Sequence, residues 1–167
     1  MKFKSSFDSL SKVITFGFSV LVVLISLNNI HTIILSDGNF KIFLLNAGII
    51  FFLLAVLLFC YLWSVQYYLT DQNQLIIKRR IGSKIILFDS ISVVTVLTTK
   101  DMFGTIRTFG NGGLFGYYGK FYNRTLGSIT LYTTQRKNRI LIRTKGGDKI
   151  IISPDDLLLA DKLRLPL

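Results

Sequence analysis

The side chains that could do chemistry in this 167-residue chain are few. All nine acidic residues are aspartates, and the sequence holds one histidine, His31, and one cysteine, Cys60. A zinc or iron–sulfur site needs about four nitrogen or sulfur ligands, and one cysteine forms no disulfide within a chain. A Ser–His–Asp or Cys–His site would depend on His31 or Cys60, and both lie in apolar segments. We therefore expect no metal site and no cofactor.

The aspartates do not suggest a catalytic carboxylate pair either. Such a pair needs two acids about 5–10 Å apart in a cleft. Four of the aspartates fall at expected turns: Asp71, Asp89, Asp101 and Asp148. Aspartate is common in turns because its side chain bonds to the local backbone. We interpret the chain as a protein that is not an enzyme.

Glycines, aromatic side chains and basic side chains are interleaved in the segment 100–127. It includes the run GNGGLFG (110–116), which is one residue too long for the phosphate-binding motif G-x-G-x-x-G, and no GK[ST] sequence is present. Loops longer than about 12–15 residues are usually functional or disordered. The many aromatic residues argue against disorder.

Two interpretations of this segment remain open. In the first, it is a surface that meets a membrane or a protein partner, because tyrosine and phenylalanine beside arginine and lysine suit such interfaces. The candidate residues of this surface are Arg107, Phe109, Phe115, Tyr117, Tyr118, Lys120, Phe121, Tyr122 and Arg124. In the second, half of the aromatic residues fill a β core and the glycines permit bends. Both can hold, because alternate strand residues face opposite sides.

Two apolar stretches precede this region, at about 13–35 and 42–65, and neither contains a charged residue. About 20 apolar helical residues cross a bilayer core of about 30 Å. The first stretch is longer than the core of a signal peptide, and no A-x-A-like cleavage site follows it. The short connection 36–41 is rich in turn formers, so we predict an antiparallel transmembrane hairpin over 13–65.

The distribution of lysine and arginine predicts the orientation of this hairpin. The N-terminal flank 1–12 carries three lysines, the connection carries only Lys41, and residues 66–167 carry 16 of the 20 basic residues. Basic residues are retained on the cytoplasmic side of a membrane. We therefore expect both termini to be cytoplasmic and the connection to lie outside.

The polar residues of interest within the hairpin are His31 and three asparagines, Asn28, Asn29 and Asn46. The asparagines would lie at similar depth in the two helices, so hydrogen bonds between them could clamp the helices together by about 0.6–2 kcal/mol. The alternative is an intramembrane relay or binding site. We favour the clamp, because a transporter core would need more helices or an oligomer.

From Gln66 onward, short β-rich runs separated by turn signals predict an antiparallel β domain. The expected strands are 67–70, 75–80, 84–88, 91–99, 128–134, 139–144 and 149–153. In strand 139–144, Arg139, Leu141 and Arg143 alternate with two isoleucines, which predicts a basic outer edge. Ser153-Pro154-Asp155-Asp156 is typical of a helix start. A strand meander closed by one helix predicts a small capped barrel.

Four segments resemble the bacterial PH domain family: YLTDQNQLII (68–77), FDSISVV (88–94), FGNGGLFGYYGKF (109–121) and ISPDD (152–156). The resemblance covers about residues 67–163 and implies a PH-like split barrel in a membrane-tethered bacterial protein. It does not imply phosphoinositide binding, because the first hairpin loop, 71–73, has no basic residue. The expected fold class is therefore a two-helix transmembrane hairpin followed by a mainly-β PH-like split barrel with a C-terminal capping helix. The expected units are the flank 1–12, the hairpin 13–65 and the PH-like domain 66–167.

Location and charge favour a non-enzymatic binding or scaffolding module in the bacterial inner membrane. Residues 66–167 hold 16 basic and 7 acidic residues, a net charge of +9. Membrane proximity explains this excess, so we expect anionic lipid headgroups or a protein as partner rather than nucleic acid. The alternative function is an accessory subunit of a larger membrane complex, a homo- or hetero-oligomer assembled through the hairpin.

Overall fold

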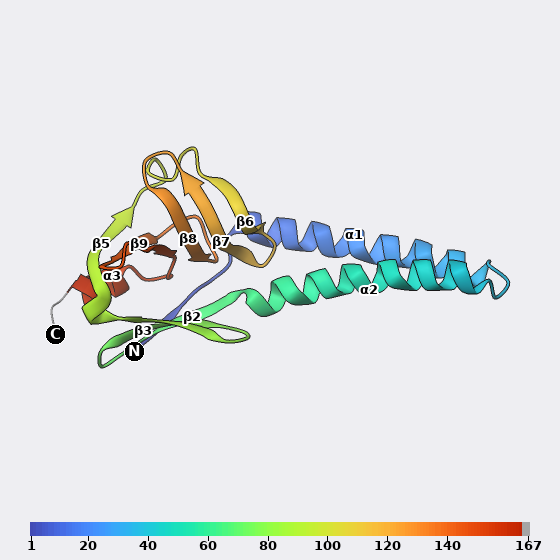
Figure 1. Cartoon of the computed structure of the whole chain (residues 1–167), viewed down its shortest axis with the longest axis horizontal. Helices are drawn as coiled ribbons and strands as arrows, with labels where there is room; N and C mark the ends of the chain where they lie inside the picture. Colours follow the sequence, from blue (N-terminus) through green and yellow to red (C-terminus); the bar gives the residue numbers. More distant parts are fainter. Residues whose placement is uncertain (165–167) are drawn as a thin grey trace.

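The computed structural model describes residues 1–164 and consists of a pair of long helices that projects from a β domain (Figure 1). In chain order the elements are β1 (Lys2–Lys4), α1 (Ser9–Ile34), α2 (Phe40–Trp63), β2 (Val65–Asp71), β3 (Gln74–Arg79), β4 (Ser83–Leu87), a 3-10 turn (Phe88–Ser90), β5 (Ile91–Leu97), β6 (Ile106–Gly113), β7 (Gly116–Asn123), β8 (Gly127–Thr133), β9 (Arg139–Thr144), β10 (Lys149–Ile152) and α3 (Leu158–Arg164). This order confirms the predicted fold class.

Helices α1 and α2 run antiparallel and present most of their apolar side chains outward (Figure 1). They hold 26 and 24 residues, so at about 1.5 Å per residue each exceeds the thickness of a bilayer core. Asn39 caps α2 by accepting hydrogen bonds from the backbone N–H groups of Lys41 and Ile42. By length and composition, both helices are able to cross a membrane.

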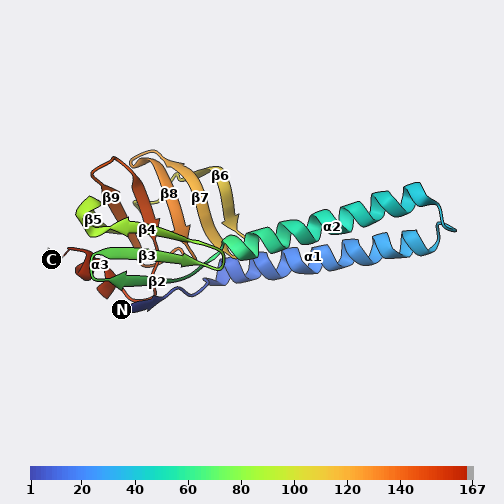
Figure 2. The ribbon, with the colours of Figure 1, turned by 60° about the horizontal axis from the view of Figure 1, so that its bottom comes forward.

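The β domain consists of two sheets. The smaller sheet has the strand order β1-β2-β3-β4, and the larger has the order β5-β9-β10-β8-β7-β6. All neighbours pair antiparallel except β8 and β10, which are parallel. The sheets pack face to face, and α3 closes one end of the space between them (Figure 2). The buried core between them is aliphatic apart from Tyr68 and Phe3, and its largest members include Leu75, Ile77, Ile140, Ile142 and Ile152.

Strand β9 is buried on both faces, so the predicted basic outer edge is wrong for two of its residues. Ile140 and Ile142 face the core between the sheets, while Leu141 belongs to a second buried cluster on the outer face of the larger sheet. Arg139 is also buried and only Arg143 is exposed. The physical reason is position, because β9 lies between β5 and β10 and the loop 98–105 covers its outer side.

The segment 100–127 is mostly a β-hairpin, β6–β7, and its glycines allow the two strands to approach. Gly110 lies opposite Gly119 in the register, with φ of +127° and +113°. A Cβ atom on either residue would overlap the backbone of the facing strand. Only glycine adopts these φ values without strain.

The first eight residues lie on the β domain, where β1 adds an edge strand to the smaller sheet beside β2. The segment Ser153–Asp156 holds them there instead of starting a helix, so the predicted helix start is four residues too early. The Asp155 carboxylate accepts hydrogen bonds from the N–H (2.8 Å) and the hydroxyl (2.6 Å) of Ser6. The buried Ser153 hydroxyl accepts a bond from the N–H of Thr134 at 3.0 Å.

Gly119→Ala is expected to destabilise the β domain strongly, because the new methyl group meets the backbone of β6 and the residue has a positive φ. The strain is worth about 1–3 kcal/mol, which lowers the melting temperature of a domain of about 100 residues by at least about 5 °C. Thermal unfolding of the detergent-purified chain measures this shift. Gly146→Ala is the control, because its Cβ meets only the Thr144 hydroxyl at 3.8 Å and its φ is ordinary. Equal melting temperatures for the two variants would contradict the prediction.

Candidate functional site

The junction between the helices and the β domain is organised by one carboxylate, that of Asp8. It caps α1 by accepting a hydrogen bond from the N–H of Ser11 at 2.8 Å. It also accepts bonds from the Tyr117 hydroxyl (3.2 Å) and from the backbone N–H and Nε of Arg136 (3.2 and 3.1 Å). The backbone N–H of Asp8 donates to Thr134. One side chain thus connects the start of α1 with β7 and the β8–β9 turn.

The tip of the β6–β7 hairpin is fixed to both helices where they leave the β domain. The Ser11 hydroxyl donates to the Gly113 carbonyl at 2.8 Å, and the N–H of Phe115 donates to the Thr15 hydroxyl at 2.9 Å. On α2, the Tyr118 hydroxyl donates to the Cys60 carbonyl at 3.0 Å. The Phe115 ring packs edge-on against Tyr61 on the same helix. The two helices and the larger sheet are therefore in direct contact.

The nine residues predicted as a lipid or partner surface lie in three different environments. Tyr117, Tyr118 and Phe121 are buried. Phe115 is half-buried at the hairpin tip against the helices. The remaining five are exposed, and they are Arg107, Phe109, Lys120, Tyr122 and Arg124.

Two-residue periodicity explains this division except at Tyr118, which shares a face with Lys120 and Tyr122 but is buried where its hydroxyl donates to the Cys60 carbonyl of α2. In the register with β8, Tyr117 and Phe121 lie on the outer face of the larger sheet. Lys120 and Tyr122 lie on the opposite face, which extends beyond the smaller sheet and is exposed there. A bulge in β6 puts Phe109 opposite Lys120. Some aromatic residues of the segment 100–127 are therefore buried in the β domain, and others are exposed, so each of the two interpretations describes part of the segment.

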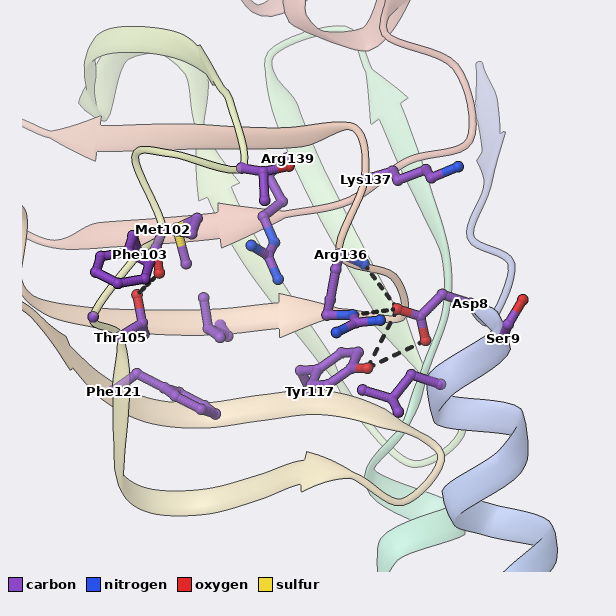
Figure 3. A pocket seen from close by; sticks show the side chains of 14 residues that line it. Asp8, Ser9, Met102, Phe103, Thr105, Tyr117, Phe121, Arg136, Lys137 and Arg139 are labelled. Carbon is purple, nitrogen blue, oxygen red and sulfur yellow. Dashed lines mark hydrogen bonds and ion pairs between the residues drawn. The ribbon is translucent and has the colours of Figure 1, made fainter.

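The outer face of the larger sheet carries a pocket of about 670 Å³ (Figure 3). Its floor is formed by side chains of β7, β8 and β9, and its walls by the loop 98–105, the start of α1 and the β8–β9 turn. Its lining includes four apolar and two basic side chains, which are Leu10, Met102, Phe121, Leu131, Arg136 and Arg139. The volume lies within the range of about 300–1,000 Å³ that is usual for small-molecule sites.

Asn123 holds the loop 98–105 over this pocket. Its buried amide donates to the Asp101 and Phe103 carbonyls, both at 3.2 Å, and to the Thr105 hydroxyl at 2.8 Å. The Asp101 carboxylate accepts bonds from the N–H and hydroxyl of Thr98, which lower its pKa. The loop is therefore held by hydrogen bonds at both ends.

Arg139 is the unusual residue of the pocket. Its side chain is 9% exposed, and its guanidinium points into the pocket (Figure 3). Its buried Nε has no hydrogen-bond partner among residues 1–164. Burial lowers the pKa of Arg139, since removal from water disfavours the charged form. Arg139 forms no ion pair among residues 1–164, and the nearby Asp8 carboxylate offsets only part of the cost of burying the cation.

Tyr117 forms part of the same pocket as a hydrogen-bond donor. Burial and the neighbouring Asp8 carboxylate raise the pKa of Tyr117 to about 12. The phenol therefore stays protonated at neutral pH and donates to Asp8. The Asp8 carboxylate also accepts hydrogen bonds from Arg136, so both Tyr117 and Arg136 stabilise its negative charge.

The asparagines predicted to clamp the helices form hydrogen bonds along their own helices instead of with each other. The Asn29 amide donates to the Ile25 carbonyl at 2.7 Å, and the Asn46 amide to the Ile42 carbonyl at 2.8 Å. Asn28 is exposed. Within the part of the chain that is described, no group of three or more histidine, cysteine or aspartate side chains is arranged to hold a metal ion.

Two packed sheets closed by a C-terminal helix define this chain as a protein with a PH-like domain, here carried on a helical pair. The model of the family described as bacterial PH domain matches residues 65–164, which are 100 of the 167 residues. The chain belongs to the bacterial PH domain family, as the sequence resemblance predicted. Membership suggests a binding or scaffolding module. No curated protein and no solved structure matches the chain.

Three important residues of the junction and pocket were missed from the sequence: Asp8, Arg136 and Arg139. Asp8 does carry a signal, because an aspartate just before an apolar helix is typical of an N-cap. Arg139 carries no such signal, because its burial depends on the loop 98–105, which lies 34 to 41 positions earlier in the chain.

Asp8→Ala is expected to loosen the junction, because it removes the cap of α1 and the acceptor for Tyr117 and Arg136. The cap and the charge-assisted bonds together are worth about 2 kcal/mol, which lowers the melting temperature by about 10 °C. Asp8→Asn retains a side chain that can cap the helix, so its melting temperature should fall by less. Thermal unfolding of the full chain measures both, with Asp148→Ala as the control in an exposed turn. A melting temperature of Asp8→Ala equal to that of the control would show that the junction does not depend on this carboxylate.

Proposed function

We propose that the chain is a non-enzymatic binding and scaffolding module of the bacterial inner membrane, with its PH-like domain held against the cytoplasmic leaflet and in contact with anionic lipid headgroups. The observation that carries this proposal is the short and rigid connection between the helices and the domain. Ser64 alone separates α2 from β2, and Asp8 joins α1 to β7. A domain fixed in this way cannot leave the membrane surface.

Basic residues at the base of the helices support contact with headgroups. Arg80 lies over the Tyr61 ring at 4.0 Å and Arg79 over the Trp63 ring at 5.0 Å. Lys12 and Lys84 are exposed, and the β3–β4 turn between Arg79 and Lys84 lies beside the end of α2 (Figure 2). Each basic group near an anionic leaflet contributes about 1 kcal/mol.

Orientation can be tested with single cysteines in a Cys60→Ser background. We expect Asp37→Cys, in the α1–α2 connection, to react with a membrane-impermeant maleimide in intact cells. Lys145→Cys, in the exposed β9–β10 turn, should react only after the cells are opened. Labelling of Lys145→Cys in intact cells would contradict a cytoplasmic domain.

Headgroup contact can be tested by native mass spectrometry of the full chain with equal amounts of phosphatidylglycerol and phosphatidylcholine. We expect phosphatidylglycerol to be retained preferentially, and the triple variant Lys12→Gln, Arg80→Gln, Lys84→Gln to weaken this preference by about tenfold or more. The matched control is Arg143→Gln, Lys145→Gln, Lys162→Gln, which removes three charges at the end of the domain far from the helices. Equal effects of the two triple variants would contradict a specific contact at the helix base.

The accessory-subunit alternative is favoured by one observation. Phe103 and Phe109 are 88% and 78% exposed, and Ile106 is exposed beside them in the chain. Exposed apolar groups of this size often mark protein interfaces. Arg107 follows Ile106 in the chain, and the Arg124 side chain lies beside Gly104, the neighbour of Phe103. A defined hetero-complex in native mass spectrometry of membranes from the host would favour this function. A monomer that retains anionic lipid would favour the module.

A further inference from the structure

We propose that the pocket on the outer face of the larger sheet binds a single-chain amphiphile with an anionic phosphate headgroup, taken from the adjoining membrane leaflet. Arg139 would bind the headgroup, and the apolar floor would hold the chain. This site is separate from the basic residues at the helix base, and the inference rests on the proposed function only in requiring the domain to lie at the membrane.

The floor of the pocket is apolar. The outer face of a barrel strand normally meets water and is polar, but here Leu131, Leu141 and Ile151 are buried in a cluster with Met102 and Phe121. Of these, Met102, Phe121 and Leu131 line the pocket. A hollow of about 670 Å³ over such a floor offers an alkyl chain the burial that stabilises it.

Two arginines line the pocket, and they differ in their partners. The Arg139 guanidinium points into the pocket without a partner for Nε, whereas Arg136 is already bound to Asp8 (Figure 3). A phosphate accepts bonds from a guanidinium in bidentate geometry. An anion here would compensate the one buried cation of the pocket that lacks a counter-ion among residues 1–164.

One end of the pocket lies next to the start of α1, where the helix leaves the β domain. Leu10, in the first turn of α1, lines the pocket, and the uncharged part of α1 starts at Val13. Three residues of helix correspond to about 4.5 Å, so this end of the pocket lies at the level of the expected headgroups. On the opposite side of the pocket from α1, the buried Met102 of the loop 98–105 contributes apolar lining (Figure 3).

The test uses the full chain in nanodiscs of neutral phosphatidylcholine, because residues 1–8 form part of the domain. The probes are dodecyl phosphate, dodecylphosphocholine with the same alkyl chain, and inorganic phosphate. Hydrogen exchange of the backbone amides in 98–105 and 116–121 reports occupation of the pocket. We expect dodecyl phosphate to slow exchange in both segments, and the other two probes to leave it nearly unchanged.

Arg139→Leu should raise the concentration of dodecyl phosphate needed for half-maximal protection by about tenfold or more, since a charge-assisted interaction is lost. Arg143→Leu is the matched control, because it changes the same residue type on the same strand and face but at an exposed position. Arg139→Lys keeps a charge without the planar fork and should give an intermediate value. If Arg139→Leu does not fold, two results still test whether Arg139 binds the headgroup: the response of Arg139→Lys and the comparison of the three probes on the wild-type chain.

Several outcomes would overturn the inference. Equal protection by dodecylphosphocholine would mean that the headgroup charge is not recognised, and equal protection by inorganic phosphate would mean a soluble anion. An unchanged response in Arg139→Leu would remove Arg139 from the site. The variant Lys12→Gln, Arg80→Gln, Lys84→Gln should keep wild-type protection, so a failure of headgroup contact at the helix base is distinguishable from a failure of the pocket.

Discussion

The hydrogen bonds of the Asp8 carboxylate hold the helical pair in place relative to the β domain. A helix begins with N–H groups that have no partner within the helix, and Asp8 satisfies one of them while also accepting from Tyr117 and Arg136. Because these partners belong to α1, β7 and the β8–β9 turn, the direction of the helical pair is determined by the β domain. The hairpin tip at Gly113 and Phe115 then adds a second contact with α1.

This arrangement gives the glycine- and aromatic-rich hairpin two roles. Its facing glycines, Gly110 and Gly119, allow two strands to approach closely, and its tip contacts the helices. Its alternate residues then divide between a pocket on one face and an exposed surface on the other. The same segment therefore joins the parts of the molecule and forms part of the floor of the candidate binding site.

Much of the fold could be predicted from the sequence, because it depends on local patterns. Uncharged apolar stretches indicated the two helices, and alternation with turn residues indicated most strands and the barrel. The hairpin β6–β7 was missed as strands because its glycines have low strand propensity, and the facing of Gly110 by Gly119 appears only in the register. The site was harder to predict from the sequence. The burial of Arg139 and the roles of Ser153 and Asp155 depend on contacts with segments far away in the chain.

The pairing of β1 with β2 has a consequence for biogenesis. The two strands are adjacent in the sheet, yet both long helices lie between them in the chain. During synthesis β1 emerges first and finds its neighbour only after α1, the connection and α2 have been made. In a hairpin that crosses the bilayer, the two strands meet only if both ends of the hairpin lie on the same side of the membrane. A chain in which only one of the two helices crossed would leave β1 and β2 on opposite sides and keep β2 as an open sheet edge, which can pair with other chains.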